Sequence, residues 1–590
     1  MPGRVLVANR GEIARRIIRA CHELGIQAVA AYGPGEERAL HVEDADDAYR
    51  LASDAVLPYL DIEAMIEVAR RSGAAAVHPG YGFLAENAAF VGACAEAGLI
   101  FIGPPASAIR AMGDKVEARR IAALAGVEAV PGTDEPVGSA EEARTWADHH
   151  GYPVAVKAAG GGGGRGFRVA RHPEELADAF AGSAGEAARY FGNPAVYVER
   201  YLEQPRHVEV QLFADGHGNA LALGERDCSV QRRHQKLIEE TPAPGIGEDL
   251  RQNLWNAAVS LARAVDYRGA GTVEFLLDAN GRFYFLEMNT RIQVEHTITE
   301  AVTGIDLVKE QIRVAAGFPL SFQRTDVQPR GHAIECRINA EDPGRGFAPG
   351  PGTLATYREP GGPGIRVDGA MDVGATILPA YDSLIAKLIT WGRDRDEAIA
   401  RMERALAEFR ISGVPTTIPF HQAVLAHPVF RAGEVATTFV ADHPEVLPAP
   451  SAVAGAVEAS STPEAPGPQR EILVEVDGRR LAVRLPEALA SVSTPRQATP
   501  GRSRPPTKRQ RESGGAIAAD GTELRSPIQG TVVRVGVETG QDVRKGDLIC
   551  VVEAMKMENE LVAHRDGTVT ALGVATGDAV KIGAVLAEIG

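Results

Sequence analysis

Residues 271–289 read GTVEFLLDANGRFYFLEMN, two apolar, β-rich segments on either side of Asn280-Gly281. An Asn-Gly pair between such segments is the strongest short-range signal for a β-hairpin. With a two-residue turn, Glu274 lies directly opposite Glu287, and like charges in that position destabilise a hairpin. A divalent cation held between the two carboxylates would turn this repulsion into a binding site. Two exposed, solvated carboxylates are the plainer alternative.

The residues that follow extend the same pattern. Asn289 lies two positions after Glu287, so it faces the same side of the strand and adds a neutral oxygen ligand. Oxygen-only ligands favour Mg²⁺ or Mn²⁺, with nucleotide phosphates completing the coordination. Arg291, Gln293 and Glu295 continue at steps of two. A cation, an amide and a carboxylate on one face predict an anion pocket with a general base.

A glycine-rich segment lies upstream of this hairpin. A predicted strand containing Lys157 is followed by five glycines at 160–164 and by a second strand at 167–170. The run satisfies GxGxxG, but it leads into a strand and not a helix, so a dinucleotide site is excluded. No Lys-Ser/Thr follows, which excludes a Walker A motif. We expect a hairpin tip whose N–H groups close over phosphates, with Lys157 supplying a charge; an ordinary surface loop is the alternative.

The C-terminal residues 523–590 contain an internal repeat. Shifted by 37 positions, Gly530-Thr531-Val532 falls on Gly567-Thr568-Val569. Two copies of a short-stranded unit must pack together to bury their apolar sides, which predicts a flattened two-fold β-sandwich. Glu553-Ala554-Met555-Lys556-Met557 lies where one copy passes into the other, so we expect an exposed turn there. Flanking methionines are unusual at such a turn, because methionine normally fills cores.

Composition restricts the function classes. The chain has 590 residues, 45% of them hydrophobic and 24% charged, and a net charge of −16. This charge argues against nucleic-acid binding and favours a cytoplasmic enzyme. Five cysteines without CxxC spacing indicate neither a disulfide framework nor a zinc site. No apolar run approaches the roughly 20 residues needed to span a membrane. A predicted strand begins at Arg4, so we expect no signal or transit peptide.

The chain divides into three regions by composition. Strands and amphipathic helices alternate up to about residue 445, an α/β pattern. Residues from about 442 to 522 are rich in Pro, Ala, Ser and Arg, typical of linkers, and are interrupted by a predicted hairpin around Asp477-Gly478. A basic stretch at 502–511 lacks aromatic residues and fits a solvated linker better than a nucleic-acid patch. The third region is the repeat.

Two stretches resemble known families. The pentapeptide around Lys556 resembles the attachment site of biotinyl carrier domains, and residues 523–590 are similar to such a domain throughout. Residues 1–445 resemble a biotin carboxylase, an ATP-grasp enzyme, over essentially their whole length. The matching stretches are VANRGEIA (7–14), HPGYGFLAEN (78–87), GDK (113–115), ERDCSVQRRHQK (225–236) and EMNTRIQVEH (287–296).

The resemblance implies an α/β fold in several parts. A Rossmann-like N-terminal domain is expected at 1–114, an ATP-grasp domain at 115–330 with its lid at about 131–204, and an α+β C-terminal domain at 331–445. A linker with a short β-hairpin would follow at 446–522. An all-β flattened-sandwich biotinyl domain would occupy 523–590.

The resemblance also implies site residues. Lys236, Arg291, Glu295 and Arg337 would be catalytic, with Glu295 as the base and Arg337 stabilising the biotin enolate. Bicarbonate would be bound by Lys236, Arg291, Gln293 and Val294. Mg²⁺ (or Mn²⁺) would be held by Glu274, Glu287 and Asn289, and biotin would be attached covalently to Lys556. ATP would be bound by Lys115, Lys157, Gly163, Gly164, Glu199, Tyr201, Leu202, His207, Gln231, His234, Glu274 and Glu287.

The implied reaction begins with attack of bicarbonate on ATP. The resulting carboxyphosphate releases CO₂ and phosphate, and CO₂ is captured by the deprotonated ureido nitrogen of biotin. No carboxyltransferase is recognisable in the sequence, so the resemblance is to an actinobacterial-type acyl-CoA carboxylase α subunit. Its implied partners are a separate carboxyltransferase β subunit in a hetero-oligomer and a biotin protein ligase. Alternatives are the biotin carboxylase subunit of a pyruvate or urea carboxylase and a non-enzymatic biotin carrier or scaffold. We hypothesise that the central hairpin helps to dock the β subunit.

Overall fold

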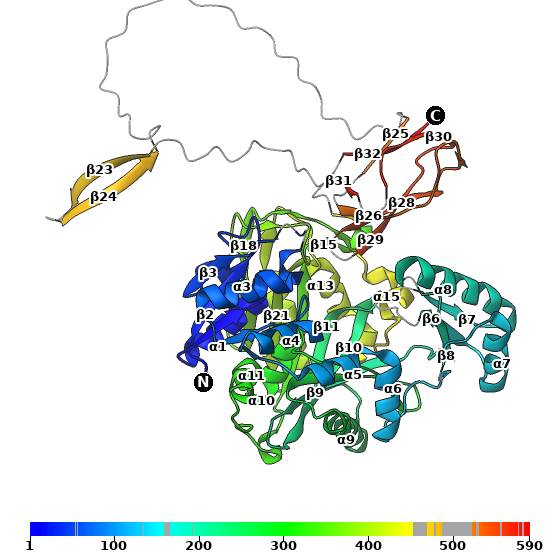
Figure 1. The fold of residues 1–590 in the computed structure, drawn as a ribbon, viewed down its shortest axis with the longest axis horizontal. Coiled ribbons are helices and arrows are strands. Elements are labelled where there is room, and N and C mark those ends of the chain that lie inside the picture. The colour runs from blue at the N-terminus through cyan, green and yellow to red at the C-terminus, as the bar shows by residue number, and fades with distance from the viewer. Residues whose placement is uncertain are drawn as a thin grey trace, which may run out of the picture. The chain divides into compact units, whose positions relative to one another are not determined.

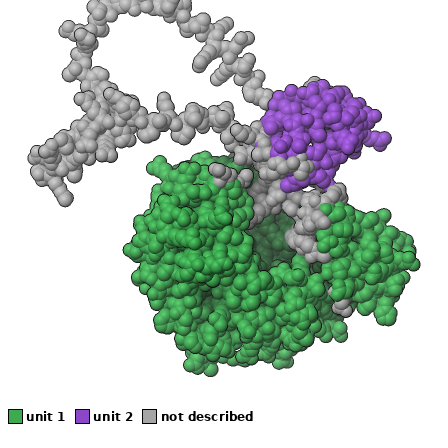
Figure 2. All heavy atoms as spheres, viewed as in Figure 1, with its two compact units in different colours: residues 1–453, 553–559 green, residues 454–552, 560–590 purple. Residues whose placement is uncertain are grey.

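The computed structural model describes the chain except residues 54, 56, 134, 159–165, 192, 452–468, 477–478, 487–521, 527–529, 555–556, 576–577 and 581–582. The chain forms two compact units, a large unit built mainly on residues 1–453 and a smaller C-terminal unit (Figure 2). Among the described helices, none is long and apolar enough to cross a membrane.

The large unit begins with a parallel five-stranded sheet in the order β3-β2-β1-β4-β5. Its central strand is almost entirely apolar because helices cover both faces of the sheet, as parallel sheets require. The elements are β1 (Arg4–Val7), α1 (Gly11–Glu23), β2 (Gln27–Tyr32), α2 (Leu40–Glu43), β3 (Asp47–Arg50), α3 (Ile62–Ser72), β4 (Ala76–His78), α4 (Ala88–Glu96), β5 (Ile100–Phe101), α5 (Ala106–Gly113) and α6 (Lys115–Leu124).

A small lobe follows, to one side of the main body of the large unit (Figure 1). Its three antiparallel strands lie in the order β7-β6-β8 and carry two helices with an apolar core between them. The elements are α7 (Ala140–His150), β6 (Val154–Ala158), β7 (Phe167–Ala170), α8 (Leu176–Phe191) and β8 (Val196–Arg200). The expected strands on either side of the glycine run are therefore confirmed.

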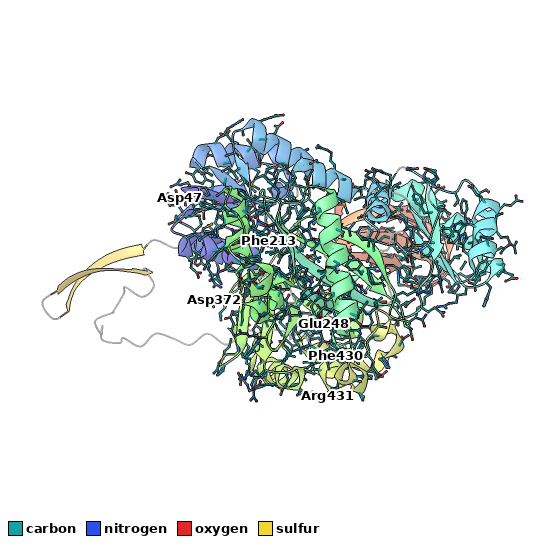
Figure 3. All side chains as sticks on the ribbon, turned by 90° about the horizontal axis from the view of Figure 1, so that it is seen from below. Asp47, Phe213, Glu248, Asp372, Phe430 and Arg431 are labelled. Atoms are coloured by element: carbon teal, nitrogen blue, oxygen red, sulfur yellow. The ribbon has the colours of Figure 1, made fainter. Side chains whose placement is uncertain are left out.

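An eight-stranded sheet in the order β13-β12-β9-β10-β11-β14-β21-β19 is the centre of the large unit. It runs without interruption across residue 330, so strands from both sides of that position share one surface. Phe213 on β9 is fully buried within it (Figure 3). The elements are β9 (Arg206–Ala214), β10 (Ala220–Arg232), β11 (Gln235–Thr241), α9 (Glu248–Ala264), β12 (Gly269–Leu277), β13 (Phe283–Asn289), α10 (His296–Thr303), α11 (Leu307–Ala315), β14 (His332–Asn339), β19 (Ile365–Gly369) and β21 (Leu384–Gly392).

The last part of the large unit packs helices and two-stranded ribbons against β14 and β21 around a large apolar core. Ser451 is bound to this part of the large unit, because its backbone N–H donates to Asp342 Oδ2 at 3.0 Å. The helices are α12 (Arg395–Glu408), α13 (Ile418–Ala426), α14 (Pro428–Ala432) and α15 (Phe439–Asp442). The ribbon strands are β15 (Glu341–Asp342), β16 (Ala348–Pro349), β17 (Gly352–Thr353), β18 (Thr356–Arg358), β20 (Thr376–Ile377) and β22 (Arg410–Ser412).

The C-terminal unit confirms the predicted two-fold repeat. Two four-stranded sheets, β25-β32-β30-β27 and β29-β28-β26-β31, enclose two apolar cores. The pair Gly530 with Val580 recurs 37 positions apart as Gly567 with Val543. The strands are β25 (Glu523–Arg525), β26 (Gly530–Val535), β27 (Asp542–Val543), β28 (Leu548–Ala554), β29 (Met557–Val562), β30 (Gly567–Leu572), β31 (Ala579–Val580) and β32 (Val585–Ile589). Lys556 falls between β28 and β29 but lies outside the described residues.

The central hairpin consists of β23 (Gln469–Val476) and β24 (Arg479–Pro486), paired antiparallel along their whole length. Val476 pairs with Arg479, so the hairpin predicted around Asp477-Gly478 is confirmed. The turn residues Asp477 and Gly478 themselves lie outside the described residues.

Candidate active site

The β12–β13 hairpin brings Glu274 opposite Glu287, as predicted, although the reasoning about its turn was wrong. Leu277 pairs with Phe283, so the loop is longer than two residues and is closed by Asp278, whose N–H donates to Arg282 O at 2.8 Å. A bulge between Glu274 and Phe275 then restores the expected register. The two deviations cancel, and a purely local turn rule could not predict either.

The row of carboxylates extends further across the sheet. On β9, Glu209 pairs with Glu274, and on β10, Arg226 pairs with Glu209. Three carboxylates therefore lie side by side on adjacent strands, and Arg226 ends the row. Glu209 and Arg226 are both completely buried. Such a row is stable only where cations face it, because an unpaired buried charge is very costly.

Lys236 on β11 provides the central cation. Its ammonium contacts Glu209 Oε2 at 2.5 Å, Glu274 Oε1 at 2.7 Å and Glu295 Oε1 at 2.7 Å. Burial alone would lower the pKa of Lys236, but the carboxylates outweigh burial and raise its pKa well above the usual range. Lys236 is therefore a permanent cation in this structure.

Glu295, directly before α10, is held from both sides. Its second oxygen accepts from Arg337 Nη2 at 2.9 Å, and Arg337 Nε donates to Glu239 Oε1 at 2.6 Å. Burial would raise the pKa of Glu295, yet Lys236 and Arg337 hold this pKa well below its usual range. Glu295 is therefore a carboxylate at neutral pH, in an environment where an unpaired acid would be neutral.

The loop after β13 departs from the predicted alternation, because the strand ends at Asn289. Arg291 turns toward Glu86, with Nε to Oε2 at 2.7 Å, and donates through Nη2 to Asn289 Oδ1 at 2.7 Å. Gln293 Nε2 donates to Glu274 Oε1 at 2.9 Å. The expectation of a continuous strand was wrong, but the loop still delivers Gln293 and Glu295 to the carboxylate row.

Two further residues of this loop and strand are held by hydrogen bonds. The backbone carbonyl of Val294 accepts from the buried Lys387 Nζ at 3.0 Å. Asn289 Nδ2 donates to Glu274 Oε1 at 3.0 Å, which places its amide on the carboxylate face as predicted.

His207, on the same face of β9 as Glu209, contacts the other oxygen of Glu274 at 2.9 Å. Burial lowers its pKa, but the charge of Glu274 outweighs burial and the net shift is upward. Gln231 Nε2 lies 3.2 Å from His207 Nδ1. His207 and Gln231 therefore join the cluster around Lys236 through Glu274.

The remaining predicted nucleotide residues lie at the lobe and its base. Lys157 on β6 forms an ion pair with Glu199 on β8, and Arg119 lies 3.4 Å from Glu199. Burial lowers the pKa of Lys115, the first residue of α6. Leu202 packs in a small apolar cluster with Val130 and Tyr284. The rings of Tyr201 and of His234, which is exposed on the β10–β11 turn, both lie beside Phe167, and the Lys157 ammonium lies over that same ring. Gly163 and Gly164 lie outside the described residues.

Sequence reasoning missed Glu209, Arg226 and Glu86 as parts of this cluster. Glu209 could have been found from its two-residue spacing to His207, which puts both on one strand face. Glu86 and Arg226 lie within stretches that carried the resemblance, but their side-chain partners come from other strands and from the loop after β13. Only the fold brings those partners together.

Family models match four consecutive parts of the chain. They are described as biotin carboxylase N-terminal domain (residues 1–109), carbamoyl-phosphate synthase L chain ATP binding domain (114–323), biotin carboxylase C-terminal domain (335–442) and biotin-requiring enzyme (522–589). The first three models together cover most of the large unit, and the fourth covers the repeat.

Similar proteins and solved structures indicate the same family as these models. The Mycobacterium leprae biotin-dependent acyl-coenzyme A carboxylase alpha3 subunit is 46% identical over 99% of this chain and 98% of its own length. A pyruvate carboxylase subunit of Methanothermobacter thermautotrophicus is 53% identical over 75% of this chain and 90% of its own. The biotin carboxylase domain of Hydrogenobacter thermophilus 2-oxoglutarate carboxylase, solved with MgADP, ADP and bicarbonate, has a TM-score of 0.73 at 48% identity, covering 76% of this chain and 99% of its own. The chain therefore belongs to the biotin-dependent carboxylases, and it is a biotin carboxylase, an ATP-dependent ligase, joined in one polypeptide to a biotinyl domain.

Proposed function

We propose that the large unit carboxylates biotin held on Lys556, using ATP and bicarbonate, and that the cluster around Lys236 performs this reaction. The observation that carries the proposal is the contact of one buried ammonium with Glu209, Glu274 and Glu295. A cation at the meeting point of three carboxyl groups is suited to an anionic substrate and to the transfer of its proton.

The side chains fit a magnesium–nucleotide complex on the hairpin. Glu274, Glu287 and Asn289 lie on adjacent strands, and carboxylate and amide oxygens are the donor set that Mg²⁺ or Mn²⁺ prefers. Asn289 Oδ1, which here accepts from Arg291, would have to turn toward the ion. We assign these three residues to the metal. When bound, the metal would neutralise phosphate charge during phosphoryl transfer.

We assign Lys115, Lys157, Glu199, His207, Gln231 and His234 to ATP, with its base beside Tyr201 and Leu202. Gly163 and Gly164 would belong to the loop that covers the phosphates. The apolar contacts of Leu202 with Val130 and Tyr284 support a base-binding position there. Closure of a glycine loop would exclude water from a reactive acyl phosphate.

Bicarbonate is assigned to Lys236, Arg291, Gln293 and the backbone of Val294, with Glu295 as the base. Lys236 and Arg337 keep Glu295 ionised, so it can accept a proton from bicarbonate at neutral pH. Arg337 would then stabilise the anionic ureido group of biotin from the other side of Glu295. Biotin, when bound, supplies the nucleophilic nitrogen that receives the carboxyl group.

The test of this assignment is Glu295→Gln, which keeps the shape of the side chain but removes its basicity. Bicarbonate-dependent ATP cleavage with free biotin should fall by a factor of about 10² to 10⁴. Glu225→Gln is the matched control, because Glu225 is equally buried on β10 but pairs with Arg251 and Trp255, away from the cluster. Full activity in Glu295→Gln would show that the assigned base is wrong.

We further propose that the chain is the α subunit of an acyl-CoA carboxylase of the acetyl- or propionyl-CoA class. The full-length similarity to the Mycobacterium leprae protein supports this assignment. A biotin carboxylase subunit of a pyruvate carboxylase is the second candidate, favoured by the Methanothermobacter relative over the large unit. The partners would be a carboxyltransferase β subunit in a hetero-oligomer and a biotin protein ligase. Five buried cysteines without a disulfide fit a cytoplasmic location.

Copurification of the full chain from its native cells, followed by assays with acetyl-CoA, propionyl-CoA and pyruvate, distinguishes the two candidates. Removal of residues 470–486, most of the β23–β24 hairpin, should weaken copurification of the β subunit while leaving free-biotin carboxylation intact. Unchanged copurification would contradict the docking role of the hairpin. The proposed domain division is 1–114, 115–330 with a lid at about 131–204, 331–445, 446–522 and 523–590.

A further inference from the structure

The Arg226 guanidinium is completely buried, and each of its five N–H groups has an acceptor. Nε donates to Glu209 Oε1 at 2.6 Å. Nη1 donates to Gln211 Oε1 at 2.7 Å and Thr299 Oγ1 at 2.9 Å. Nη2 donates to Thr272 Oγ1 at 3.2 Å and Gln293 Oε1 at 2.8 Å. A fully satisfied guanidinium of this kind is held in one orientation.

The contact with Gln293 determines which way its amide points. A guanidinium can only donate, so the amide must turn its oxygen toward Arg226. The amide nitrogen is thereby directed at the carboxylate row, where it donates to Glu274 Oε1 at 2.9 Å. With the opposite orientation, the amide N–H₂ would face the guanidinium N–H and the amide oxygen would face a carboxylate. Arg226 therefore makes Gln293 a donor toward the substrate side.

The contact with Glu209 determines the position of the catalytic cation. Arg226 occupies Glu209 Oε1, which leaves Oε2 to accept from Lys236 at 2.5 Å. The carboxylate thus transmits the placement of Arg226 to Lys236. Through Thr299 the same guanidinium also anchors α10, the helix that begins immediately after Glu295.

We propose that Arg226 is a positioning residue for bicarbonate binding, which sets the amide of Gln293 and, through Glu209, the ammonium of Lys236. The inference rests on the proposed function, since it assumes that Gln293 and Lys236 bind bicarbonate. Arg226 is completely buried with all its N–H groups used by protein acceptors, so it would act through these neighbours and not on the substrate itself. Its signature is a selective effect on bicarbonate affinity.

Arg226→Lys tests this role in the full-length chain. A lysine keeps the charge opposite Glu209 but cannot reproduce the planar fork that reaches Gln293. The KM for bicarbonate should rise at least tenfold, while the KM for ATP stays within about twofold. Glu225→Gln is the control, because the equally buried Glu225 side chain pairs with Arg251 and Trp255 and not with Gln293, and its KM for bicarbonate should change by less than threefold. An unchanged bicarbonate KM in Arg226→Lys overturns the proposal.

A double-mutant cycle with Gln293→Leu separates the possible failures. If Arg226 acts through Gln293, adding Arg226→Lys to Gln293→Leu should raise the bicarbonate KM by much less than it does in the parent chain. If the increase in bicarbonate KM of the double variant equals the product of the two single-variant increases, Arg226 does not act through Gln293, and only the role of Gln293 remains. An unchanged KM in Gln293→Leu alone overturns the proposed bicarbonate site and this inference with it. If tryptophan emission shows that Arg226→Lys is unfolded, Arg226→Gln is measured against the same expectations.

Discussion

The interiors of the two units differ in kind. In the large unit, Lys236, Arg226, Glu209 and Lys387 are buried and paired with one another or with neighbouring carboxylates. Among the described residues of the C-terminal unit, only Ser526 is a buried polar side chain, and both cores consist of apolar residues. Buried ion pairs are weak contributors to stability, because desolvation offsets their attraction. We therefore attribute the buried ion pairs of the large unit to its chemistry. The apolar cores of the C-terminal unit serve only to stabilise its strands and turns.

The difference also separates what each unit contributes to the reaction. Under the proposed function, the carboxyl group would be formed beside the charged cluster and carried elsewhere by a unit that takes no part in forming it. Three predictions test how independent these two contributions are.

The largest expected effect is on Lys556. Lys556→Ala should abolish covalent biotin on the chain, measured by streptavidin blotting, and with it all carboxylation of the chain itself. Carboxylation of free biotin by the large unit should continue near the parent rate, because the charged cluster is unchanged. Biotin label that persists in Lys556→Ala would refute the assigned attachment site.

A smaller effect is expected in an apolar core of the C-terminal unit. Ile549→Ala removes a fully buried side chain from one of the two apolar cores and should destabilise that unit by about 2–5 kcal/mol. Biotinylation should fall as the unit unfolds. The fluorescence of Trp146, Trp255 and Trp391 should not change, since all the tryptophans lie in the large unit.

Val562→Ala is the control for that variant, because Val562 is 41% exposed and its loss should cost little. A shift in tryptophan emission in Ile549→Ala would mean that the two units do not unfold independently.

The smallest effect concerns a buried histidine of the large unit. Burial lowers the pKa of His421 to about 4, while an unfolded histidine titrates near 6.5. The unfolded chain therefore binds more protons below pH 6.5, and the contribution of His421 to stability falls as pH decreases toward 4.

Compared with His421→Gln, the parent should thus lose about 1.4 kcal/mol of unfolding free energy per pH unit between pH 6 and 4.5. Urea unfolding followed by tryptophan emission measures this difference in the large unit alone. A pH-independent difference would show that His421 is protonated in the folded state.

Much of the fold could be predicted from the sequence because its signals are local. The strands around the glycine run, the 37-residue repeat and the hairpin pairing of Val476 with Arg479 each follow from spacing along the chain. The facing pair Glu274 and Glu287 was also predicted, although a longer loop and a compensating bulge produce it. Local rules therefore predicted the correct residue pair although the predicted turn was wrong.

The active-site cluster likewise combines residues that local signals identify and contacts that they do not. The candidate residues Glu274, Glu287, Asn289 and Lys236 could be identified from period-two spacing and motif stretches alone. The contacts of Lys236 with three carboxylates and of Arg226 with Gln293 could be found only in the folded chain. These contacts join strands β9 to β12 with the loop before α10, and their partners are up to 67 positions apart. The spacing of side chains along the chain shows only which residues share one face of a strand. Which strands become neighbours depends on how the whole chain buries a shared core.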